Sequence, residues 1–128
     1  MSESENKQQL TPSCDLAQTV ATMATESWRV SKMFERLLRK LDAGEGNRYK
    51  HQLQWFMKKV NEALEQADLK IVNVQGHPFD PGMAATPLNI EEFDDGEALI
   101  VDQMLEPIIM GKGGLFKTGT VTLRRIER

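Results

Sequence analysis

The chain has 128 residues and a formal net charge of −3, from 16 Lys and Arg against 19 Asp and Glu. Hydrophobic residues make up 40% and charged residues 27%, which is typical of a globular domain and excludes disordered and collagen-like chains. The slightly acidic charge lacks the basic excess expected of a protein that binds duplex nucleic acid. Cys14 is the only cysteine, which excludes an intramolecular disulfide and a thiolate cluster within one chain.

Residues 1–10 are polar, and we expect them to form a flexible N-terminal tail. They lack the apolar stretch of a signal peptide. No apolar run in the chain approaches the roughly 20 residues that span a bilayer. We therefore expect a cytoplasmic protein with no membrane partner.

The first helix is predicted from Thr11 to Leu41, a length of about 46 Å at 1.5 Å per residue. Thr11 is a candidate N-cap and Pro12 suits the first helical position, with Ser13 an equally good cap. The helix is predicted from a heptad pattern, in which apolar residues recur at alternating intervals of four and three. Only Ser27 interrupts the series Leu16, Val20, Met23, Ser27, Val30, Phe34, Leu37 and Leu41.

A second helix is predicted after a glycine-rich break at residues 42–47, with Asn47 as its N-cap. The same spacing continues through Tyr49, Leu53, Phe56, Val60, Ala63 and Ala67. Two long amphipathic helices joined by a short loop form an antiparallel hairpin.

A lone hairpin leaves its apolar stripes in water, so we expect two copies to pair in a homodimeric four-helix bundle. The alternative is that the helices pack only on the second half of their own chain. The predicted dimer interface consists of Val20, Met23, Val30, Phe34, Leu37, Leu41, Leu53, Phe56 and Val60.

Strand signals dominate after Asp68. Strands are predicted at residues 69–75, 97–105, 107–110 and 115–126, separated by turns rich in Gly and Pro. Because helices come first and strands follow, the predicted fold class is α+β: a helical dimerisation region at residues 11–68 and a small β-domain at residues 69–128.

No motif predicts catalysis, a cofactor or a metal site. The acidic run at residues 91–95 lacks the spacing of a calcium loop, and a solvated loop is the favoured interpretation over a hydrolase site. His51 and His77 have no nearby Cys or second His that would complete a zinc site. The glycine-rich residues 111–114 lack the spacing and ending of a phosphate-binding loop. We therefore expect a protein that is not an enzyme.

The junction and β-domain resemble GrpE-type nucleotide exchange factors. Residues 71–81 (IVNVQGHPFDP) are similar to that family's strand, glycine and Pro-Leu/Phe-Asp-Pro turn. Residues 96–101 and 116–123 resemble its later strands, and the likeness extends over about residues 34–123. After the turn the chain departs from the family pattern and reads Gly82-Met83-Ala84.

The resemblance implies a homodimer whose β-domain enters the nucleotide-binding domain of a DnaK-type chaperone ATPase and promotes ADP release. Partner contacts are then expected at Phe79, Pro81, Met83 and Lys117, with Asp80 fixing the turn. The alternative interpretation keeps the fold but not the chaperone. The chain would then be an adaptor or dimerisation module that docks on another protein through residues 106–119.

Overall fold

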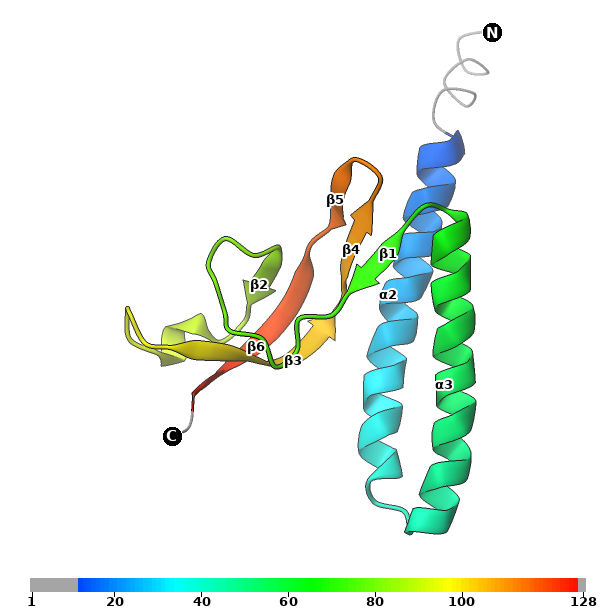
Figure 1. Ribbon diagram of the computed structural model, residues 1–128, viewed down its shortest axis with the longest axis horizontal. Helices are drawn as coiled ribbons and strands as arrows, with labels where there is room; N and C mark the ends of the chain where they lie inside the picture. Colours follow the sequence, from blue (N-terminus) through cyan, green and yellow to red (C-terminus); the bar gives the residue numbers. More distant parts are fainter. Residues whose placement is uncertain (1–11, 127–128) are drawn as a thin grey trace, which may run out of the picture.

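The computed structural model describes residues 12–126 and the side chains from residue 16 onward. Figure 1 shows a long helical hairpin with a separate β-domain against one side of its first helix. The expected N-terminal tail and the candidate cap Thr11 lie outside the described residues. The helices are α2 (Pro12–Leu38) and α3 (Ala43–Gln66), and the short 3-10 helix is η1 (Ile90–Glu92). The strands are β1 (Lys70–Val72), β2 (Ala85–Pro87), β3 (Leu99–Glu106), β4 (Ile108–Gly111), β5 (Gly114–Lys117) and β6 (Gly119–Arg125).

The hairpin is confirmed, but its connection is shorter than predicted. Asp42, not Asn47, caps α3: its side chain accepts a 3.0 Å hydrogen bond from the backbone N–H of Glu45. An aspartate one residue before a helix satisfies a free amide and interacts favourably with the helix dipole. The expected break at residues 42–47 is therefore mostly the first turn of α3. The first helix correspondingly ends at Leu38, three residues earlier than the heptad pattern predicts.

The junction between α3 and the β-domain is a tight helix C-terminus. Asp68 adopts a left-handed conformation, with φ of 59°. The N–H of Leu69 then donates to the carbonyl of Leu64 over 2.9 Å, and the N–H of Asp68 to the carbonyl of Glu65 over 3.0 Å. These two bonds satisfy carbonyls at the helix end in the Schellman pattern and turn the chain directly into β1.

The β-domain consists of two three-stranded sheets, in the orders β1-β4-β5 and β2-β6-β3. All pairings are antiparallel except that of β2 with β6. The predicted strand at residues 115–126 is wrong as a single element, because β5 and β6 belong to different sheets. Gly119 begins β6, where a Cβ would lie 2.8 Å from Cγ1 of Ile108 and 2.9 Å from the carbonyl of Glu106. β2 and η1 were not predicted from the sequence.

Two apolar clusters form the core. The larger one joins the β2-β6-β3 sheet to α2 through Trp28 and contains Val101, Met104 and Val121, none of which is exposed. The smaller one packs Leu64 and Ile109 between the helices and the β1-β4-β5 sheet, against Ala21 and Ala24 of α2. Because both clusters include α2, the hairpin and the β-domain are packed together as one body.

Candidate functional site

The face of α2 opposite the β-domain carries an exposed apolar row with a spacing of seven residues. Trp28 faces β3, whereas Val30, two residues further, lies about 200° round the helix. Exposed fractions are 67% for Leu16, 65% for Met23, 56% for Val30 and 55% for Leu37. Four apolar side chains on one stripe of a helix are unusual on a monomer surface, where apolar residues are mostly scattered.

The other residues of the predicted dimer interface divide into two groups. Phe56 and Leu41 are also exposed, at 43% and 40%. The half-buried members are Val20, Phe34, Leu53 and Val60. Val20 and Val60 pack against the smaller of the two core clusters, so they also stabilise the hairpin.

The contact of α2 with the β-domain uses residues outside the heptad series. Ala21, Ala24, Thr25, Trp28 and Ser31 are buried on this face. The hydroxyl of Thr25 donates to the carbonyl of Ala21, and that of Ser31 to the carbonyl of Trp28, so neither is left unpaired. Their small size lets the β-domain approach the helix closely. This contact was not predicted, although small residues recur along this face of α2 and could have indicated it.

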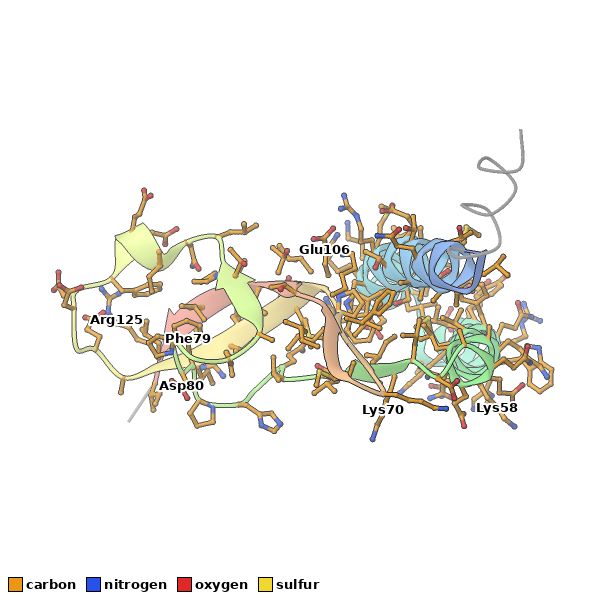
Figure 2. The ribbon with its side chains drawn as sticks, turned by 90° about the horizontal axis from the view of Figure 1, so that it is seen from above. Lys58, Lys70, Phe79, Asp80, Glu106 and Arg125 are labelled. Carbon is orange, nitrogen blue, oxygen red and sulfur yellow. The ribbon has the colours of Figure 1, made fainter. Side chains whose placement is uncertain are left out.

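The turn at residues 79–83 is built as expected, with Asp80 at its centre. The Asp80 carboxylate accepts a 3.0 Å hydrogen bond from the N–H of Gly82, and its carbonyl accepts one of 2.9 Å from the N–H of Met83. The N–H of Phe79 donates to the carbonyl of Leu99 over 2.9 Å, which fastens the turn to β3. Figure 2 shows Phe79 and Asp80 in the β-domain, well away from the two helices.

The expected contact residues in this turn differ in exposure. Pro81 is exposed, whereas Phe79 and Met83 are half-buried and pack against the larger core cluster. A partner can therefore reach Pro81 fully but Phe79 and Met83 only in part. Phe79 and Met83 also stabilise the β-domain.

Lys117 does not lie with the other three expected contacts. It is on β5, opposite Ile109 of β4, and lines a groove with Gln18 and Thr22 of α2. Phe79 is fastened to Leu99 at the start of β3, and the far end of β3 lies about 23 Å away at 3.3 Å per residue. Glu106 is the last residue of β3, and the charge of Lys117 lowers its pKa, which places Lys117 near that far end.

Glu106 is the one described group whose pKa clearly departs from its ordinary value. A 2.8 Å hydrogen bond from the Thr120 hydroxyl is the main cause that lowers its pKa, and the charges of Lys117 and Arg29 act in the same direction. Partial burial opposes them. Arg29 of α2 also donates to Glu106 over 3.2 Å, which adds a polar link between the hairpin and the β-domain.

Two adjacent grooves include residues on the side of α2 that faces the β-domain, and only the smaller one also includes β-domain residues. The larger, of about 560 Å³, lies between α2 and α3 near the hairpin connection, with Leu38, Leu53 and Met57 among its lining residues. The smaller, of about 60 Å³, lies between α2 and β3. They share Glu35 and Arg39. The smaller groove was not predicted from the sequence, because its residues on α2 and on the β-domain are far apart in the chain.

Among residues 16–126, whose side chains are described, no group of three His, Cys, Asp or Glu is arranged to hold a metal ion. The acidic residues 91, 92, 94 and 95 are exposed, as are His51 and His77. Trp55 is 59% exposed on α3, with the Lys59 ammonium 4.5 Å from its ring centre. In the described part of the chain, neither helix has the length and hydropathy needed to cross a membrane.

Comparisons with protein-family models, with curated proteins and with solved structures find no match to this chain.

Proposed function

We propose that the chain is a homodimeric, GrpE-like exchange factor that binds a DnaK-type chaperone ATPase and promotes ADP release. In this proposal it acts in the cytoplasm, needs no cofactor and makes or breaks no covalent bond. It stabilises an open conformation of the ATPase by binding that conformation more tightly than the closed one. The exposed row Leu16, Met23, Val30 and Leu37 is the observation on which the proposal chiefly depends.

The exposed row supports a dimer because it lies on the side of α2 that the β-domain leaves free. A second hairpin placed there would cover the row and bring Phe56 of α3 into the same interface. The result is a four-helix bundle with heptad packing between the copies. The β-domain of each copy would remain outside the bundle.

The rigid attachment of the β-domain supports its role in opening the ATPase. A domain that separates two lobes of a partner must keep its position relative to the rest of its own chain when the partner binds. Here the β-domain is fixed to α2 through the buried Trp28 and through Arg29 and Glu106. The 79–83 turn lies away from the helices, where a partner has access to it (Figure 2).

The direct test measures release of fluorescent ADP from a DnaK-type ATPase in rapid mixing, with and without the full-length chain. We expect the chain to accelerate release at least tenfold. Leu37→Asp, which places a charge in the proposed bundle, should abolish dimerisation and reduce the acceleration at equal chain concentration. No acceleration with several ATPases of this type would contradict the exchange proposal.

A second candidate function is that of an adaptor without exchange activity. It is favoured by Leu115 and Phe116 on β5, which are 52% and 39% exposed in the region that this interpretation assigns to docking. The same assay separates the two functions. A stable dimer that does not affect ADP release, and whose binding to a partner depends on Leu115 and Phe116, would support the adaptor.

A further inference from the structure

We infer that the two grooves along α2 bind a protein segment that combines carboxylates with apolar side chains. The site, which we call the corner, consists of these two adjacent grooves between α2, α3 and β3. On α2 it lies opposite the exposed row Leu16, Met23, Val30 and Leu37, although Leu41 and Leu53 of the predicted dimer interface also line the larger groove. The inference does not depend on nucleotide exchange.

The charge of the corner opposes that of the whole chain. Its lining residues include four cationic side chains and two acidic ones, whereas the chain has a net charge of −3. The cations are Lys32, Arg36, Arg39 and Lys50.

Both carboxylates of the corner already have partners. Glu35 pairs with Lys32 over 3.6 Å, and Asp42 caps α3 through its 3.0 Å bond from the Glu45 N–H. Lys32 is further held 4.4 Å from the centre of the Trp28 ring.

Three cations of the corner have no ion pair with the described side chains of residues 16–126, namely Arg36, Arg39 and Lys50. Arg36 and Arg39 are three positions apart on a helix, so their like charges repel each other. Their guanidinium groups can each bind a carboxylate through two parallel hydrogen bonds. An anionic occupant would remove the repulsion and provide the missing partners.

The remaining lining residues point to protein rather than nucleic acid. The wall and floor are formed by Leu38, Leu53 and Met57 of the hairpin, which are half-buried. Gln75 and Gln103 add amide donors on the β-domain side. No aromatic side chain lines either groove, so the aromatic platform on which single-stranded bases usually stack is missing there. An acidic segment with apolar side chains would fit both the charge and the floor.

The test uses the full chain and a fluorescein-labelled 12-residue peptide of repeating Asp-Leu-Glu-Gly, followed by fluorescence anisotropy. We expect binding that weakens as the salt concentration rises. A peptide with Lys in place of both acids should not bind. A 12-nucleotide oligouridine with the same label tests a nucleic-acid occupant, and tighter binding of it than of the acidic peptide would overturn the inference.

The variant Arg36→Glu/Arg39→Glu should weaken binding of the acidic peptide at least tenfold. Its matched control is Arg48→Glu/Lys58→Glu on α3, which changes the net charge equally at residues that line neither groove. The control should change the affinity less than twofold. Equal losses in the two variants, or no binding by the unaltered chain, would contradict the inference. All four residues are exposed, so both variants should keep the melting temperature of the parent.

Discussion

The indole N–H of Trp28 donates a 2.7 Å hydrogen bond to the backbone carbonyl of Met104, 76 positions further along the chain. Both side chains are in the larger core cluster, and Met104 is fully buried. This bond fixes the helical hairpin to β3, an edge strand of the β2-β6-β3 sheet. Trp28 therefore contributes both packing and a buried hydrogen bond to the contact between the hairpin and the β-domain.

Trp28→Phe should lower the free energy of unfolding by about 1–3 kcal/mol, because the buried Met104 carbonyl loses its partner. Urea unfolding followed by circular dichroism measures the loss. Trp55→Phe is the matched control, since Trp55 is 59% exposed and its replacement should change stability by less than about 0.5 kcal/mol. Equal effects of the two changes would contradict the anchoring role.

Met23→Asp and Val30→Asp should each convert the proposed dimer into monomers, because a carboxylate in an apolar interface has no partner there. Size-exclusion chromatography with light scattering gives the mass directly. Leu88→Asp is the control: Leu88 is 61% exposed on the β-domain, and the change should leave the dimer intact. Dissociation by Leu88→Asp, or dimers in the α2 variants, would refute this location of the interface.

Gly119→Ala should destabilise the β-domain by about 1–3 kcal/mol, since its Cβ would overlap with Ile108 and the carbonyl of Glu106. Gly113→Ala provides the comparison, because a Cβ at Gly113 has no atom within 4 Å. Thermal unfolding measures the melting temperatures of both variants, and that of Gly119→Ala should be the lower. A Gly119→Ala protein as stable as Gly113→Ala would show that the strand junction is looser than described.

The contribution of Glu106 to stability should depend on pH. Its pKa in the folded protein is lower than its ordinary value of 4.5, so folding favours the ionised form. The stabilisation is therefore complete well above pH 4.5 and is lost as the pH falls through the lowered pKa. The free energies of unfolding of the parent and of Glu106→Gln, measured in urea, should differ at pH 7 and converge as the pH falls below the lowered pKa. A difference that grows on acidification would have the wrong sign.

Pro81→Glu should reduce the acceleration of ADP release without changing stability, because Pro81 is the exposed member of the expected contacts in the turn. Phe79→Ala is a less direct test: its side chain packs on the core, and the loss would lower β-domain stability as well as partner binding. Unfolding curves measured beside the release assay separate the two effects. Unchanged release with Pro81→Glu would exclude this turn as the contact.

The α+β fold, the two helices and the strands β1, β3 and β4 could be predicted from hydrophobic spacing, β-branched residues and turn signals. Spacing does not identify which stripe of an amphipathic helix contacts its own chain. The heptad residues Met23 and Val30 are exposed in the single chain, while the small residues Ala21 and Ala24 form the internal contact. Small side chains give a weak hydrophobic signal, although they permit the closest packing.

The candidate surfaces were predictable only where they are local in sequence. The turn around Asp80 follows from Pro, Asp and Gly in four successive residues, and the structure contains it. The corner could not be found in this way, because Arg36 and Gln103 meet only after the β-domain packs on α2. The distance of Lys117 from Phe79 likewise follows from the division of the last strands between two sheets.

Sedimentation equilibrium of the unaltered chain at micromolar concentration tests the central claim most directly, since both candidate functions require the exposed row of α2 to be covered by a second copy. The account predicts a particle of twice the chain mass that does not dissociate on tenfold dilution. A monodisperse particle of one chain mass across that range would contradict it.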